Sequence, residues 1–164
     1  MTQSPALPSI GDVVAPVLAR VEKRHQPLLI AIAERLAAER YRSWAGESEM
    51  GAHAARLRAC AEREDEIAGR VEALFPDAKA AQRELLAKHP DLAELNRSLF
   101  AGRPLREQFR IQANGERLGA ATWRSFARQE SSSAARDTYL ACAELEEASA
   151  LVLEALLRDS PYAQ

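Results

Sequence analysis

The sequence predicts an all-α fold, a four-helix bundle made of two repeated antiparallel helical hairpins joined by a helical crossover. Residues 34–77 recur without a gap as residues 116–159, with 18 identities in 44 aligned pairs, and such self-similarity indicates a duplicated structural unit. Ala, Leu, Glu and Arg dominate the composition, and these side chains lose little conformational freedom on a helix. Each copy has two long helical segments around a short loop, which makes the two helices antiparallel neighbours.

The chain is expected to fold as one domain, residues 17–159, because 164 residues are too few for two domains of ordinary size. Residues 1–16 are rich in Pro, Ser and Gly and predict a flexible N-terminal tail, and residues 160–164 predict a short C-terminal one. The domain divides into a first hairpin, a crossover and a second hairpin, at residues 27–77, 78–104 and 105–159.

Two prolines bear on where the first hairpin begins. Pro27 either opens the first long helix, residues 27–45, or kinks a longer helix that begins near Pro16, because proline supplies no amide hydrogen to the helix. Residues 46–51 interrupt the helical pattern and predict a loop. The second helix then covers residues 52–75 and ends before a proline.

The segment between the hairpins has no counterpart in the repeat. It contains two short helical stretches, residues 78–88 and 92–100, and Gly and Pro in residues 102–104 then introduce the third long helix, residues 105–128. The fourth helix covers residues 134–158. A connection of about 30 residues is long enough to cross the length of a bundle. A simple up-down-up-down bundle would not need it, so the crossover topology is favoured.

Composition and motifs exclude several classes of function. The 22 basic and 24 acidic residues are interspersed and give a net charge of −2, so no nucleic-acid-binding patch is expected. No apolar run predicts a membrane span or a signal peptide, and two cysteines are no disulfide framework, so a cytoplasmic location is expected. No Ser-His-Asp set, phosphate-binding loop, CxxC or HExxH motif is present.

Two glutamates at equivalent positions of the repeat, Glu64 and Glu146, lie in the middle of apolar helix faces. An ionised carboxylate is costly to bury without a partner, a metal or a raised pKa, so these positions are candidates for a functional site. At about 100° per residue, the side chains that share their faces are His53, Leu57, Cys60, Ile67, Ala68, Val71 and Phe75 on one helix, and Tyr139, Cys142, Ala150, Leu153 and Leu157 on the other.

Glu34 and Glu116 are the expected partners of these two residues. The first loop is centred halfway between Glu34 and Glu64, and the second loop halfway between Glu116 and Glu146. Residues equidistant from the turn of an antiparallel hairpin lie at the same height. We therefore expect the two glutamates of each hairpin to lie level and to face each other.

One carboxylate on each of four helices, related by duplication, resembles the ferritin-like di-iron carboxylate superfamily. The likeness covers residues 27–158, and that family takes one Glu from each of two helices and a Glu-x-x-His from each of the other two. Tyr41 and Trp123, seven residues after Glu34 and Glu116, resemble aromatic positions beside such centres. The resemblance implies a metal site for iron or manganese, with the ligands Glu34, Glu64, Glu116 and Glu146.

The chain departs from that pattern at both histidines. The third residue after Glu64 is Ile67, and the third residue after Glu146 is Ser149, so no imidazole ligand is expected. Four carboxylates still supply the oxygen ligands that hard divalent cations prefer.

Three functional hypotheses follow. In the first, the protein has lost the full di-iron site and is a binding or structural module, a homodimer through an outer helix face, and arginines such as Arg35, Arg40 or Arg117 satisfy its buried glutamates. In the second, it is a dinuclear metal-carboxylate oxidoreductase in which the four glutamates hold a metal that activates dioxygen or peroxide. In the third, the core holds an apolar small molecule in place of metal. Cys60 and Cys142 are expected to be ordinary core residues in all three.

Overall fold

The computed structural model describes residues 6–159, which form seven α-helices and two short 3₁₀ turns and contain no strand. The predicted all-α class is therefore confirmed. None of these helices is both long and apolar enough to span a membrane. The predicted C-terminal tail, residues 160–164, lies outside the described residues, as do residues 1–5.

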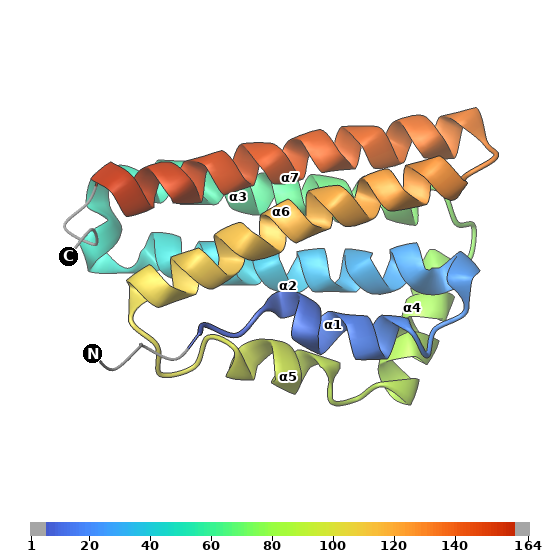
Figure 1. Ribbon diagram of the computed structural model, residues 1–164, viewed down its shortest axis with the longest axis horizontal. Coiled ribbons are helices and arrows are strands. Elements are labelled where there is room, and N and C mark those ends of the chain that lie inside the picture. Colours follow the sequence, from blue (N-terminus) through green and yellow to red (C-terminus); the bar gives the residue numbers. More distant parts are fainter. Residues whose placement is uncertain (1–5, 160–164) are drawn as a thin grey trace.

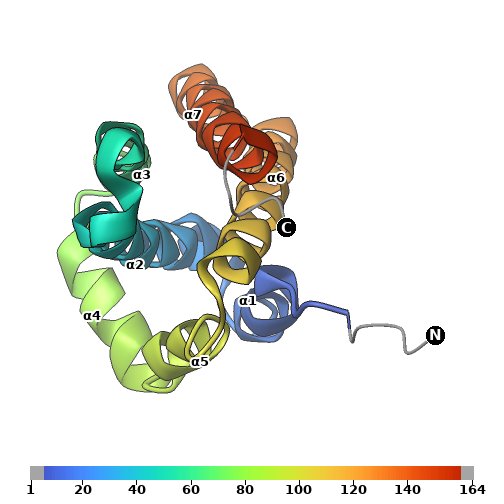
Figure 2. The same ribbon diagram turned by 90° about the vertical axis from the view of Figure 1, so that its left-hand side faces the viewer.

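Four long helices run along the long axis of the molecule (Figure 1). They are α2 (Gln26–Gly46), α3 (Ala54–Glu72), α6 (Leu105–Gln129) and α7 (Ser133–Asp159). Helices α2 and α3 pack against each other in opposite directions, as do α6 and α7, and α3 also contacts α7 (Figures 1 and 2). Side chains from all four helices therefore meet in one interior.

Pro27 lies in the first turn of α2, where a missing amide hydrogen is harmless, so the proline opens this helix. The turn between α2 and α3 is a 3₁₀ segment, η2 (Ser48–His53). Gly51 in this turn has φ of 24°, a conformation that side chains with a Cβ rarely adopt. Both features agree with the loop expected at residues 46–51.

Two shorter helices return the chain along the length of the molecule. Helices α4 (Ala78–Lys88) and α5 (Leu92–Ser98) lead from the end where α3 finishes to the opposite end, where α6 begins (Figure 1). Helix α4 packs on α2, and α5 packs on the N-terminal helix α1. This path returns the chain to the end of the molecule where α3 begins, and α6 starts there (Figure 1).

The N-terminal segment differs from the prediction. Within residues 1–16, where a flexible tail was expected, a helix begins, α1 (Ile10–Leu18), and it contacts α5 and α6. Ser9 accepts a hydrogen bond from the start of this helix while Asp12 accepts one from the Ser9 amide, which is a capping box. Val17, which belongs to this helix, is fully buried. The capping box and the apolar face therefore outweigh the Pro, Ser and Gly content of the segment.

Candidate metal centre

The four predicted glutamates form a polar layer between two apolar clusters. Each of the four long helices contributes to both clusters, one of which contains Tyr41, Leu57, Phe109 and Leu153, and the other Ile30, Ile67, Trp123 and Tyr139. On every helix the glutamate falls between the residues of one cluster and those of the other. All four are buried, with exposed fractions of 8%, 0%, 1% and 1% for Glu34, Glu64, Glu116 and Glu146.

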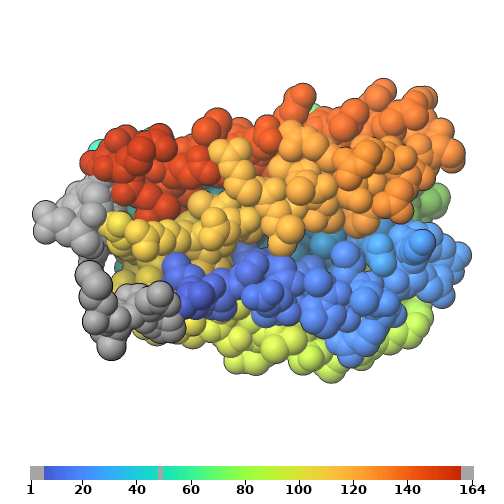
Figure 3. Space-filling model, viewed as in Figure 1, coloured from blue at the N-terminus to red at the C-terminus, as the bar shows by residue number. Residues whose placement is uncertain are grey.

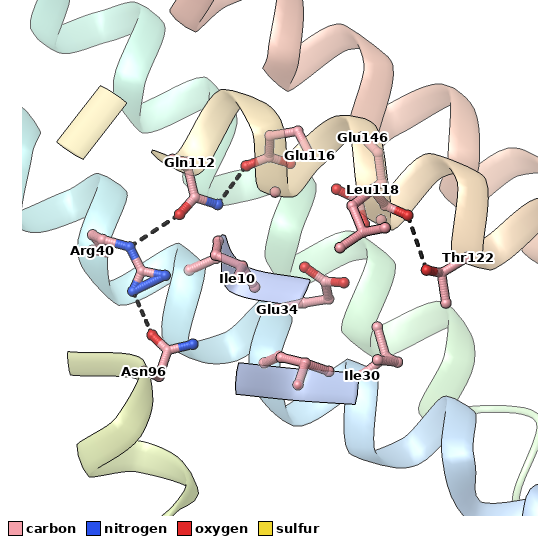
Figure 4. Close-up of a pocket in the computed structure, with 15 residues that line it drawn as sticks. Ile10, Ile30, Glu34, Arg40, Asn96, Gln112, Glu116, Leu118, Thr122 and Glu146 are labelled. Carbon is pink, nitrogen blue, oxygen red and sulfur yellow. Dashed lines mark hydrogen bonds between the residues drawn. The ribbon is translucent and has the colours of Figure 1, made fainter. Parts of the chain in front are cut away.

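Three of these carboxylates converge closely. Glu34, Glu64 and Glu146 each offer an oxygen atom, and these atoms all lie within 4.8 Å of one another. Glu116 borders the same site, and Figure 4 shows it with Glu34 and Glu146 around one cavity. The structure thus brings together all four residues that the sequence singles out.

Glu116 is held at one oxygen and left open at the other. The Tyr41 hydroxyl and the Gln112 amide nitrogen each donate a hydrogen bond of 2.7 Å to Oε1 of Glu116. Arg40 donates to the Gln112 amide oxygen at 3.1 Å and to Asn96 at 2.8 Å (Figure 4), which fixes the orientation of the Gln112 amide. The other oxygen of Glu116, Oε2, is buried without a hydrogen-bond partner in the described residues.

Glu64 and Glu146 are each held by a hydrogen bond at one carboxylate oxygen as well. Ser149 donates a hydrogen bond of 2.8 Å to Oε1 of Glu64, and the Trp123 indole donates one of 2.9 Å to Oε1 of Glu146. Oε2 of Glu64 has no partner among the described residues. Ser149, at one of the positions where a histidine would stand in the di-iron pattern, therefore orients a carboxylate across the interior instead of acting as a nitrogen ligand.

Gly119 provides the space for one of these carboxylates. A Cβ atom at this position would lie 2.5 Å from Oε1 and 2.9 Å from Oε2 of Glu146. Those distances are well inside ordinary contact, which for heavy atoms is about 3.5–4.0 Å. The carboxylate of Glu146 is therefore packed directly against the backbone of α6.

The first hypothesis expected arginines to satisfy the buried glutamates, and this is wrong for Arg35 and Arg117, whereas the buried charge of Arg40 acts on the layer and opposes the rise that burial causes in the pKa of Glu34. Arg35 pairs with Asp65 and with a second acid on α3, and Arg117 pairs with Glu154. Arg40 hydrogen-bonds the neutral side chains of Asn96 and Gln112. A long arginine side chain reaches several acceptors from one helix position, so helix faces alone do not decide its partner. None of these three arginines forms an ion pair with the glutamate layer.

Burial changes the protonation of the glutamate layer. It raises the pKa of Glu34 to about 7, with a further contribution from the charge of Glu116, and it raises the pKa of Glu64 and Glu146 well above the usual range. Carboxylates this close cannot all ionise without a compensating cation. Without a metal the layer therefore retains protons at neutral pH, and a divalent cation would compete with those protons for the oxygens.

The two cysteines are buried and unbonded, as expected for core residues. Burial raises the pKa of Cys60 to about 11 and that of Cys142 to about 12, so both thiols are protonated at neutral pH. Neither belongs to the group of converging ligand atoms.

The residues that sequence reasoning missed are Gln112 and Asn96. Only Gln112 carries a signal in the sequence, since it lies one helical turn before Glu116.

No protein-family model, curated protein or solved structure matches this chain. Four buried glutamates meet between two apolar clusters, neutral donors hold one oxygen on each of three of them, and two further oxygens have no partner among the described residues.

Proposed function

We propose that this protein binds divalent metal ions, with Glu34, Glu64, Glu116 and Glu146 as the ligands. The observation that carries the proposal is the convergence of three carboxylate oxygens within 4.8 Å in a buried layer. Burying an ionised carboxylate costs several kcal/mol unless a cation or hydrogen bonds compensate. The unpartnered oxygens of Glu64 and Glu116 are atoms that a metal ion would satisfy. An all-oxygen ligand set suits hard cations, and iron or manganese is the expected metal.

We further infer that the four long helices form a ferritin-like four-helix bundle of two repeated hairpins. The repeat of residues 34–77 in residues 116–159 coincides with most of α2–α3 and of α6–α7. The returning segment α4–α5 is consistent with a crossover. In this arrangement each helix supplies one glutamate at the same height.

A second candidate function is a metal-dependent oxidoreductase. It is favoured by the hydrogen bonds from Tyr41 to Glu116 and from Trp123 to Glu146, because both donors are aromatic side chains that can exchange an electron. Bound iron or manganese would supply Lewis acidity and redox chemistry. The residues of this chain would hold the ligands in place and exclude water from the layer.

Metal content tests the first proposal. The protein is produced in medium supplemented with iron and manganese, purified without chelators, and measured for metal per chain. We expect up to about two metal ions per chain, as in other carboxylate sites with two metals. The variant Glu64→Gln plus Glu146→Gln should lose them, because each change replaces a ligating carboxylate with an amide of similar shape.

The matched control is Glu62→Gln plus Glu144→Gln, since these glutamates are exposed and occupy equivalent positions of the repeat. Equal metal content in both double variants would refute the site. A wild-type protein that stays metal-free after loading would refute metal binding altogether, and a binding or structural module, as a homodimer, would then be the better hypothesis.

Dioxygen consumption tests the second candidate. Ferrous iron is added without oxygen, dioxygen is then admitted, and its uptake is followed with an electrode. Faster uptake by the wild type than by the Glu64→Gln plus Glu146→Gln variant is the expected result. Equal uptake by a wild type that binds iron would reject the oxidoreductase and leave metal binding intact.

A further inference from the structure

A cavity of about 70 Å³ adjoins the glutamate layer between α1, α2 and α6. Glu34, Glu116 and Glu146 line it, and Figure 4 shows Ile10 of α1 among the side chains around it. The rest of the wall is largely apolar, with Ile10, Val14, Ile30, Ala33, Ala37 and Leu118, and it also includes the polar side chains of Arg40, Asn96, Gln112 and Thr122. The cavity therefore has acidic, polar and apolar parts to its wall.

Two features of the cavity indicate a ligand. Glu116 is 1% exposed, and apart from a protonated carboxyl of the layer itself, no donor among the described residues reaches its Oε2 atom, so a buried acceptor at the cavity wall is open to a ligand. The volume is also larger than one water molecule requires, and about half of the 150 Å³ cavity that accepts benzene in another protein. A molecule of about two to four non-hydrogen atoms fits such a space.

Helix α1 lies beside this cavity and lines it with Ile10 and Val14. It belongs to neither hairpin, and it lies at the surface beside α6 (Figure 3). Its close approach to α6 depends on glycines: a Cβ at Gly115 would crowd the end of the Ile10 side chain, and a Cβ at Gly11 would lie 2.7 Å from a Leu118 methyl group. The side chains of Ile10 and Val14 contribute to the apolar part of the cavity wall.

We propose that this cavity binds a small molecule with an apolar body, that one end of the molecule meets the glutamate layer, and that α1 is the cover over it. The inference deepens the proposed function, because three of the proposed metal ligands line the same cavity. Its tests use the metal-free protein, so they succeed or fail independently of metal content.

Xenon is the probe for the cavity. Xenon is titrated into ¹⁵N-labelled protein, and saturable amide shifts are expected at residues that line the cavity, such as Ile30, Ala33 and Leu118. The variant Ala33→Leu fills the space and should abolish these shifts. Ala121→Leu is the control, because Ala121 is exposed on α6 and should leave them unchanged. A wild type without saturable shifts at the lining residues would overturn the binding site.

A disulfide tests the cover. A Cβ atom built at Gly115 lies 3.7 Å from the Cβ of Ile10, which is within the usual range of about 3.5–4.5 Å for a disulfide. In the variant Ile10→Cys plus Gly115→Cys, oxidation should tie α1 to α6 and slow xenon exchange at least about tenfold, as expected when a gating motion is blocked. Reduction should restore the rate, and each single variant should respond to neither treatment.

Mass spectrometry establishes whether the disulfide has formed. Oxidised protein that carries the bond and still exchanges xenon as fast as reduced protein would overturn α1 as the cover. Failure of the bond to form under oxidising conditions would overturn the close placement of α1 on α6. Metal content measured on the same proteins before the metal is removed reports on the proposed function separately.

Discussion

Replacing Gly119 with alanine should weaken metal binding without removing any proposed ligand. The new Cβ would lie 2.5 Å from Oε1 of Glu146, and ordinary contact between heavy atoms is about 3.5–4.0 Å. The carboxylate would have to retreat by about 1 Å. That movement would also lengthen its 2.9 Å hydrogen bond from Trp123.

Two effects of opposite sign set the size of the change in stability. A lost hydrogen bond to a buried carboxylate costs about 1.5–3 kcal/mol, whereas alanine in place of glycine inside a helix gains about 0.5–1 kcal/mol. The net expectation is a decrease of about 0.5–2.5 kcal/mol in the free energy of unfolding. Displacing a ligand, or removing the group that holds it in place, lowers metal affinity by about 10–100-fold.

The matched control is Gly69→Ala in α3, where a Cβ would meet nothing within 4 Å. This variant should gain about 0.5–1 kcal/mol from helix propensity alone and bind metal like the wild type. Urea denaturation of the metal-free proteins gives the stabilities, and titration with Mn²⁺ against a competing chelator gives the affinities. If Gly119→Ala gained stability as Gly69→Ala does and bound Mn²⁺ with unchanged affinity, the placement of Glu146 as a ligand against α6 would be refuted.

Three further predictions concern the hydrogen bonds and protons of the glutamate layer. Ser149→Ala removes the donor to Glu64 and should lower the free energy of unfolding by about 1–3 kcal/mol, measured by urea denaturation; an unchanged value would mean that this bond is absent in solution. Trp123→Phe removes the donor to Glu146 and should lower Mn²⁺ affinity by about tenfold or more, and unchanged affinity in a chelator competition would contradict the supporting role of the indole. The pKa of Glu34 is about 7 in the folded protein against an ordinary value of 4.5, so the folded state binds this proton more tightly than the unfolded state. Its contribution to stability is full below pH 4.5 and is lost as the pH rises through about 7, and between pH 5 and pH 7 the free energy of unfolding of the metal-free protein should fall by about 2 kcal/mol. Metal-loaded protein should show the opposite trend, because protons displace the metal as the pH falls; urea denaturation at pH 5 and pH 7 checks both signs.

The sequence predicts the helices and the glutamate layer because both depend on periodicity and on duplication. Glu64 and Glu146 occupy the centres of apolar faces, and the symmetry of each hairpin about its loop places Glu34 and Glu116 at the same level. The N-terminal helix was missed because a nine-residue helix has little periodicity of its own, and its capping box lies among residues typical of a tail. These features are therefore visible only once α6 provides the surface on which α1 packs.

The hydrogen-bond donors around the layer were predictable in position but not in target. Tyr41 and Trp123 occupy equivalent positions of the repeat, and both donate to a glutamate of the layer. Tyr41 reaches from α2 to Glu116 on α6, whereas Trp123 reaches from α6 to Glu146 on α7 within its own hairpin. Both copies of the repeat keep a hydrogen-bond donor at this position, but Tyr41 donates to a glutamate of the other hairpin and Trp123 to a glutamate of its own hairpin. A sequence alignment of the two copies shows that the donor position is shared, but it cannot show which hairpin carries the accepting glutamate.

The same divergence explains why the cavity lies on one side of the glutamate layer. Ala33 and Ala37 of the first copy correspond to Gly115 and Gly119 of the second. In the second copy, one glycine admits the side chain of Ile10 from α1, and the other admits a glutamate carboxylate against the helix backbone. The glycines of α6 thus give up helix propensity, by about 1 kcal/mol each, for close approach at the height of the proposed metal ligands. Alanine at either position would clash with the Ile10 side chain or with the Glu146 carboxylate, so the close packing of these two side chains on α6 is the reason that the second copy has glycine where the first has alanine.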